Sequence, residues 1–66
     1  MEYTNTQIRN LIAEYIHNSD DRKMLSLRLI DGMTFEQIGF EMGMTTKTVR
    51  TRIHKGEETL FKHIPG

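Results

Sequence analysis

The sequence predicts a small all-α domain of four helices joined by short connections. Apolar residues recur every three or four positions along most of the chain, which is the spacing of a helix face. Residues that cap helix N-termini precede these stretches, and glycines follow two of them. No segment alternates apolar and polar residues as a strand would, and 66 residues suffice for one domain. We therefore expect residues 1–66 to form a single compact all-α domain.

The first helix is predicted to begin after Thr4, because Thr4 and Gln7 have the spacing of a capping box. The apolar residues that follow at helical spacing are Ile8, Leu11, Ile12, Tyr15 and Ile16. Residues 17–19 interrupt this pattern, so we expect the helix to end there and a short connection to follow.

The second helix has a polar beginning and is then apolar on almost every side. Ser19 is expected to cap it, and Asp20 and Asp21 suit the positive end of its dipole. Its apolar residues are Met24, Leu25, Leu27, Leu29 and Ile30. Such a helix is normally enclosed by its neighbours, so we expect it to be buried. Gly32 stands where a left-handed C′ residue is expected to end it.

The last two helices are predicted from a second capping box and the residues around it. Thr34 and Gln37 form the box, and Gly43 ends this third helix. Its apolar residues are Phe35, Ile38 and Met42. The fourth helix is expected to run from near Thr46 to near Ile64. One narrow stripe on it forms the predicted core seam, made of Val49, Ile53, Gly56, Leu60 and Ile64.

The segment 35–53 meets the demands of a helix-turn-helix motif. A small residue is needed where the two helices cross, and Gly39 occupies that place, where alanine is also expected to be tolerated. Gly43 suits a turn that needs a left-handed φ. The apolar residue of the turn, the cap and the two apolar anchors of the second helix are Met44, Thr45, Val49 and Ile53. Because the second helix of this motif enters the major groove, the pattern indicates binding to double-stranded DNA.

The formal net charge is zero, yet the charge is unevenly distributed. Residues 1–44 carry a net −3, whereas residues 45–66 carry a net +3. Four bases lie between Lys47 and Lys55 with no acid among them. Charge alone leaves two interpretations open, an anion-binding surface and an ordinary solvated helix face.

Two stretches of the chain resemble region 4 of bacterial sigma factors. Residues 22–39, RKMLSLRLIDGMTFEQIG, are similar to the start of that region. Residues 48–60, TVRTRIHKGEETL, resemble the recognition helix of the extracytoplasmic-function class. The resemblance extends over residues 7–64. It implies a four-helix domain whose last helix enters the major groove of the promoter −35 element.

The chain also departs from that family. The usual Leu-Pro before the second helix is replaced by Asn18-Ser19, and Gly39 stands where alanine is more usual. Nothing resembles region 2, which in sigma factors binds core polymerase and opens the −10 element, so we do not expect a complete initiation factor. Chains of this stand-alone type resemble small regulators encoded by bacteriophages and integrated elements.

Positions on the predicted recognition helix assign roles toward DNA. Because the N-terminal turns of this helix approach the base edges, the candidates for the groove are Thr46, Lys47, Arg50, Thr51 and His54. Arg50 is expected to contact O6 and N7 of a guanine. Thr45, Arg52 and Lys55 are expected to reach phosphates instead.

Catalysis and metal binding are not expected. The chain has no cysteine, which excludes disulfides, thiol catalysis and Cys-ligated zinc. His54 and His63 point about 180° apart on one helix, and His17 lies on another. Asp20 and Asp21 are adjacent at a helix start and do not converge, and nothing resembles a phosphate loop. We therefore expect no enzyme, no metal and no cofactor.

Two functions and several partners remain open. The first function is sequence-specific DNA binding that regulates transcription, and the second is a sigma-like module that docks on RNA polymerase or another host protein. Phe40 either packs under the first helix or forms a partner surface. Phe40, Phe61 and Tyr3 also offer surface for a homodimer that reads an inverted repeat, with attachment to another protein as the alternative. The sequence shows neither a membrane span nor a signal peptide, so we expect a cytoplasmic protein.

Overall fold

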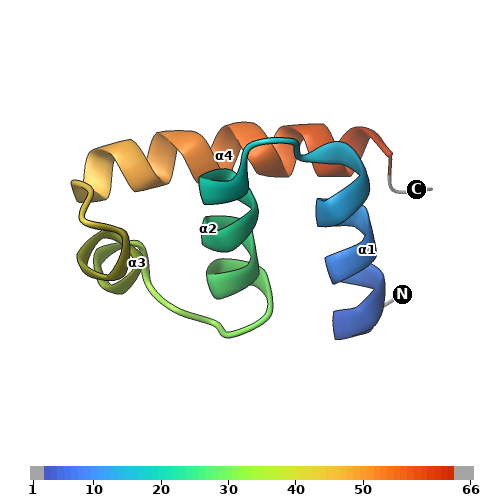
Figure 1. The fold of residues 1–66 in the computed structure, drawn as a ribbon, viewed down its shortest axis with the longest axis horizontal. Coiled ribbons are helices and arrows are strands. Elements are labelled where there is room, and N and C mark those ends of the chain that lie inside the picture. Colours follow the sequence, from blue (N-terminus) through green and yellow to red (C-terminus); the bar gives the residue numbers. More distant parts are fainter. Residues whose placement is uncertain (1–2, 64–66) are drawn as a thin grey trace.

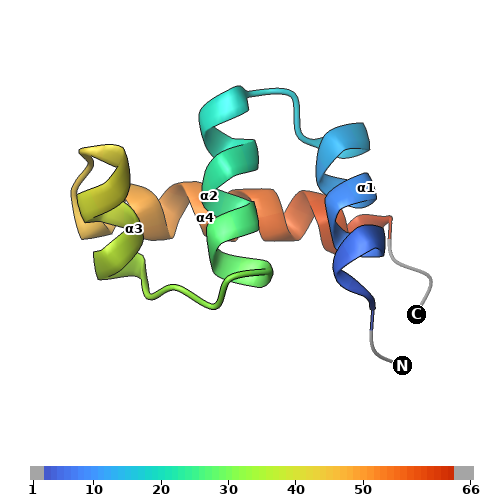
Figure 2. The same ribbon diagram turned by 60° about the horizontal axis from the view of Figure 1, so that its bottom comes forward.

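The computed structural model describes residues 3–63 and confirms the predicted all-α architecture (Figure 1). Its helices are α1 (Asn5–Tyr15), α2 (Ser19–Leu29), α3 (Phe35–Met42) and α4 (Thr46–Lys62). Figures 1 and 2 show α1, α2 and α3 arranged along α4, with α2 in the middle. α2 packs against each of the other helices, but of its predicted apolar residues Met24 and Leu25 are buried and the others are half-buried, so it is not enclosed on every side. Residues 3–63 contain no strand.

Both predicted capping boxes are present. The Thr4 hydroxyl accepts the Gln7 backbone N–H at 3.2 Å, and the Gln7 side chain accepts the Thr4 N–H at 2.8 Å. Thr34 and Gln37 repeat this exchange at 3.1 and 2.9 Å. Thr45 caps α4, where its hydroxyl accepts a backbone N–H of the first turn at 3.2 Å. These local patterns therefore set the start of three helices.

The cap of α2 is Asn18, so the prediction that Ser19 caps this helix is wrong. The Asn18 side-chain oxygen accepts the backbone N–H groups of Asp20 at 2.9 Å and of Asp21 at 3.1 Å. Ser19 is instead the first helical residue. Asparagine and serine are comparable N-caps, and asparagine reaches two amides at once here, which fixes the start one residue earlier.

The ends of α1 and α2 also use partners that sequence reasoning did not identify. The Arg22 guanidinium donates to the carbonyl of Ile16 and, at 2.7 Å, to that of Ala13, so a side chain from α2 binds free carbonyls at the end of α1. Gly32 has the predicted positive φ, +70°. It lies two residues beyond Ile30, the C-cap of α2, rather than directly after it.

The hydrophobic core runs along one side of α4. The predicted seam is buried at Val49, Ile53, Gly56 and Leu60, whereas Ile64 lies outside the described residues. The other buried apolar side chains are Ile12, Ile16, Met24, Leu25 and Ile38. All four helices contribute to this one core, which lies on the seam side of α4. The opposite face of α4 is exposed, for example at Lys47, Thr51 and His54. None of the described helices has the length and apolar character needed to cross a bilayer.

Two glycines allow α4 and its preceding turn to approach other elements closely. A Cβ on Gly39 would lie 2.7 Å from the Met44 carbonyl oxygen, a distance that real Cβ atoms essentially never show. The predicted need for a small residue at Gly39 is confirmed. The expectation that alanine is tolerated there stays a prediction, and this geometry argues against it, because the close neighbour is a backbone atom of the turn. A Cβ on Gly56 would meet the Leu25 side chain, also at 2.7 Å.

Candidate nucleic-acid interface

Helices α3 and α4 and the three residues between them form a helix-turn-helix. α3 ends at Gly43, whose φ of +67° is the left-handed conformation predicted for the turn. The Met44 N–H then donates to the Gly39 carbonyl at 2.9 Å, which folds the turn back onto α3. Met44 is half-buried beside the core, as expected of an apolar residue that fills the turn. The turn therefore holds the N-terminus of α4 at a defined place relative to α3.

The N-terminal half of α4 presents most of the predicted site residues to solvent. The exposed ones are Thr45, Lys47, Arg50, Thr51, His54 and Lys55, whereas Thr46 and Arg52 are half-buried. The segment from Lys47 to Lys55 contains no acid. The helix dipole adds partial positive charge at the same end. This surface, Thr45 to Lys55 on the exposed side of α4, is called the basic face below.

Phe35, expected as part of the apolar stripe of α3, lies next to the basic face. Its ring centroid lies 5.9 Å from the guanidinium carbon of Arg50 and 5.8 Å from the centroid of the His54 ring. The Arg28 guanidinium lies 4.4 Å over the same ring, and it donates to the Met33 carbonyl at 2.9 Å. Sequence spacing gave no signal for this arrangement, because Arg28, Phe35 and Arg50 belong to three different helices.

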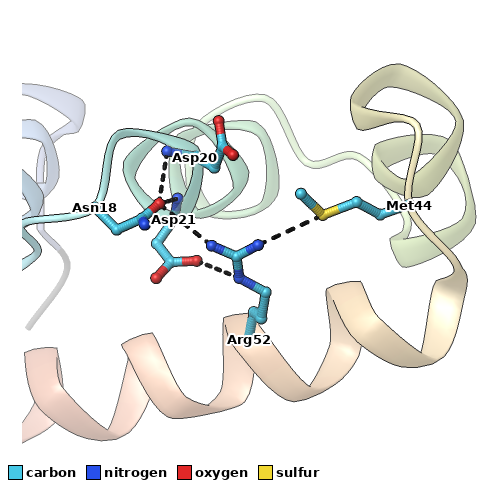
Figure 3. A network of polar contacts seen from close by, with 5 residues as sticks. All are labelled: Asn18, Asp20, Asp21, Met44 and Arg52. Carbon is cyan, nitrogen blue, oxygen red and sulfur yellow. Dashed lines mark hydrogen bonds and ion pairs between the residues drawn. The ribbon is translucent and has the colours of Figure 1, made fainter.

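Arg52 has a different environment from the other bases of the basic face. Its Nε donates to the Asp21 carboxylate at 2.7 Å, and a terminal nitrogen donates to the Asn18 side-chain oxygen at 3.2 Å. The other terminal nitrogen lies 3.8 Å from the Met44 sulfur. Figure 3 shows the guanidinium directed at the start of α2 and the turn. The phosphate contact predicted for Arg52 stays a prediction, and these partners argue against it.

Thr45 is also partly engaged within the protein. Its hydroxyl accepts the Thr48 N–H and donates to the Thr48 hydroxyl at 2.9 Å. By contrast, the described contacts of Lys47, Thr51 and Lys55 include no side-chain hydrogen bond or ion pair. These three side chains extend from the exposed side of α4.

The histidines are not arranged as a metal site within the described chain. His63 stacks on Tyr15 with ring centroids 3.8 Å apart, and His54 lies beside Phe35. Among residues 3–63, no three histidine, cysteine or acidic side chains are grouped so that they could hold a metal ion.

The family described as Sigma-70, region 4 matches residues 18–60. That match spans α2, α3 and nearly all of α4, which is well over half of the chain. The chain belongs to the sigma-70 region 4 family. No curated protein and no solved structure matches the chain significantly.

Membership of the sigma-70 region 4 family confirms the resemblance drawn from the sequence. Helix α1 lies outside the matched residues, although the resemblance was expected to begin near residue 7. Region 4 is a DNA-binding, transcription-related domain and not an enzyme family. The basic face lies on the helix that this family is expected to place on DNA.

Proposed function

We propose that this region 4 domain binds double-stranded DNA in a sequence-specific manner and thereby regulates transcription. The observation that carries the proposal is the basic face: exposed bases on α4, without an acid between Lys47 and Lys55, held by a helix-turn-helix. In this motif the N-terminal turns of the second helix contact base edges in the major groove. Bacterial DNA lies in the cytoplasm, so the proposed function implies a cytoplasmic protein.

Arg50 is the residue that we assign to direct base readout. A guanidinium can donate to both O6 and N7 of guanine, which is the commonest specific contact in the major groove. Phe35 lies beneath Arg50 at 5.9 Å, a cation–π contact that favours this placement of the exposed side chain before DNA arrives. A restricted side chain loses less conformational entropy on binding, which favours a single readout geometry.

The remaining residues of the predicted site divide between contacts to the DNA bases and contacts to the DNA backbone. We assign Thr46, Lys47, Thr51 and His54 to the groove, in agreement with their place in the first turns of α4. Lys55 lies further along the helix and suits a phosphate, as does Thr45 at the N-terminus. Phosphate contacts supply affinity and orientation, whereas the groove contacts supply the preference for one sequence.

Selection of bound duplexes from a random pool tests this proposal. The chain is expected to enrich one sequence motif and to bind it more tightly than a scrambled duplex of the same length. The affinity for the selected duplex is expected to fall with salt, and Lys55, the exposed cation assigned to a phosphate, is expected to contribute about 0.9 to the magnitude of the log–log slope. Binding that is equal for all duplexes would remove the sequence-specific part of the proposal.

A second candidate function, docking on a protein, is favoured by the outer face of α3. The Phe40 side chain is 91 % exposed, so it does not pack under α1. It borders a shallow hollow of about 590 Å³ whose lining includes Met33, Glu36 and Glu41. Exposed aromatic surface often marks a protein-binding site, and the two acids do not favour contact with DNA. RNA polymerase is the partner that region 4 membership makes the first to test.

Binding of purified core RNA polymerase to the wild-type chain and to Phe40→Ser tests the docking function. Docking through this face would be supported if the variant loses binding and if the wild-type affinity for the polymerase depends little on salt. Binding that persists in Phe40→Ser, or its absence in both chains, would reject it. The DNA affinity of Phe40→Ser is expected to match that of the wild type in either case, because Phe40 lies away from the basic face.

A homodimer is the further partner that we propose for the DNA-binding form. Phe61 is 59 % exposed and borders an apolar pocket of about 190 Å³ together with Tyr3 and Leu60. A single helix-turn-helix buries only roughly 600–1,000 Å² of protein surface on DNA, so a second copy would add affinity. The selected motif is then expected to be an inverted repeat. Sedimentation as a monomer at tens of micromolar, with a non-palindromic motif, would reject the dimer.

A further inference from the structure

Arg52 is the one base between Lys47 and Lys55 whose described contacts include an ion pair. Its side chain is 30 % exposed, and that of its partner Asp21 is 29 % exposed. The guanidinium contacts three parts of the molecule at once: the connection before α2 through Asn18, α2 itself through Asp21, and the helix-turn-helix turn through Met44 (Figure 3).

The geometry of this contact is directional. A guanidinium is planar and presents its N–H groups in fixed directions, so each of its three nitrogens is matched here to a separate acceptor. The Asn18 oxygen that accepts from Arg52 also accepts the backbone N–H groups of Asp20 and Asp21. The cap of α2 and the side chain from α4 therefore form one network.

We propose that Arg52 is a positioning residue for DNA recognition, which acts through Asp21 and Asn18 and does not contact the phosphate backbone. This inference rests on the proposed DNA-binding function. Arg52 follows Arg50 and Thr51 on α4. The buried Ile53 comes next, and His54 and Lys55 follow it. The contacts of the Arg52 guanidinium therefore join this part of α4 to the start of α2 and to the turn, and so help to hold the direction of the basic face.

Base readout requires such control. Side chains that bind a specific partner must be held within about 0.5 Å and 10–20° of the productive geometry. The apolar seam of α4 sets the rotation of the helix, because Val49 and Ile53 are fully buried against the core. The hydrogen bonds of Arg52 add directional contacts from this part of α4 to the start of α2 and to the turn.

Electrostatics oppose the alternative in which Arg52 contacts a phosphate. To reach DNA, the guanidinium would have to leave the Asp21 carboxylate, which it meets at 2.7 Å. That carboxylate would then remain without its partner near a phosphate of like charge, which is unfavourable. The other exposed bases carry no such penalty.

The substitution Asp21→Asn separates the two roles, because they predict opposite changes in specificity. A positioning role predicts that the ratio of affinities for the selected and scrambled duplexes falls, by roughly threefold to tenfold, as expected for contacting residues that are coupled. A phosphate role predicts that released Arg52 strengthens binding to both duplexes and leaves the ratio unchanged. The latter result would overturn the inference.

A matched pair of substitutions, Arg52→Met and Lys55→Met, provides the second arm. Each removes one charge and keeps a linear apolar stem. Lys55→Met is expected to weaken both duplexes and to reduce the magnitude of the salt slope by about 0.9. Arg52→Met is expected to keep the wild-type slope and to lose the preference for the selected duplex. A slope reduced as in Lys55→Met, with the preference intact, would assign Arg52 to a phosphate.

Thermal melting of each variant at the same salt concentration is the control for loss of folding. If Arg52→Met is unfolded at the assay temperature, Arg52→Lys replaces it, because lysine keeps the charge but not the planar fork. The positioning role predicts a reduced affinity ratio for Arg52→Lys, whereas a phosphate role predicts a near-wild-type ratio. If the wild-type chain binds no duplex, the proposed function fails as well. If the wild-type chain binds the selected duplex but Arg52→Met has a reduced salt slope, the positioning role is refuted and the proposed DNA-binding function stands.

Discussion

Replacing Gly39 by alanine is expected to destabilise the domain, although alanine is the better helix former. The added Cβ would lie 2.7 Å from the Met44 carbonyl oxygen, so the turn must move by roughly 0.7 Å to reach ordinary contact. The turn resists this movement because the Met44 N–H is bonded to the Gly39 carbonyl at 2.9 Å. Overpacking of this kind costs about 1–3 kcal/mol, while the helix propensity of alanine returns about 1 kcal/mol. We expect a net loss of up to about 2 kcal/mol.

Thermal unfolding followed by circular dichroism measures this effect. In a domain of this size each 1 kcal/mol lost lowers Tm by about 4–8 °C, so a loss of up to about 2 kcal/mol corresponds to a fall of up to about 15 °C. Gly56→Ala is the matched control, since it gains the same helix propensity but meets side-chain atoms of Leu25 instead of a backbone carbonyl. It is expected to change Tm less than Gly39→Ala does. A Gly39→Ala chain that melts at or above the wild-type temperature would refute the described approach of the turn to α3.

Three further predictions concern residues with distinct roles. Arg50→Ala is expected to relax the preference at one base pair, at a cost of about 1–3 kcal/mol, whereas Lys55→Ala should weaken all duplexes alike; binding titrations against single-base variants of the site separate these outcomes. Asn18→Ala should lower the free energy of unfolding by about 0.5–2 kcal/mol in urea titrations, while Ser19→Ala should change it little. Phe40→Ser should leave Tm nearly unchanged, because the side chain is 91 % exposed; a large fall would mean that Phe40 packs in the core.

Features of the fold that depend on neighbours in the sequence were predictable. Thr4 with Gln7, and Thr34 with Gln37, form capping boxes because the partners are three residues apart. The seam of α4 follows from helical spacing in the same way. The start of α2 was misplaced by one residue, since Asn18 and Ser19 are both good caps and only the three-dimensional fit selects between them.

The environment of Arg52 was not predictable, because its partners are remote in sequence. Asp21 and Asn18 precede it by 31 and 34 positions, and helical spacing, which separates Arg52 from Arg50 by position on α4, does not indicate that Arg52 has partners in α2. Whether position 39 tolerates a larger residue than Gly39 depends in the same way on where the Met44 carbonyl of the turn lies. The composition of the basic face was visible in the charge pattern, but which bases are free to contact DNA depends on tertiary contacts.

Substitution of single guanines in the selected duplex by 7-deazaguanine tests the central claim most directly. This change removes the N7 acceptor in the major groove and leaves base pairing intact. The account predicts that at one position it weakens wild-type binding by roughly twofold to tenfold, the loss of about half a bidentate contact, and that Arg50→Ala is insensitive to it. Wild-type binding that is unaffected at every guanine, or an equal loss in Arg50→Ala, would contradict major-groove readout by Arg50.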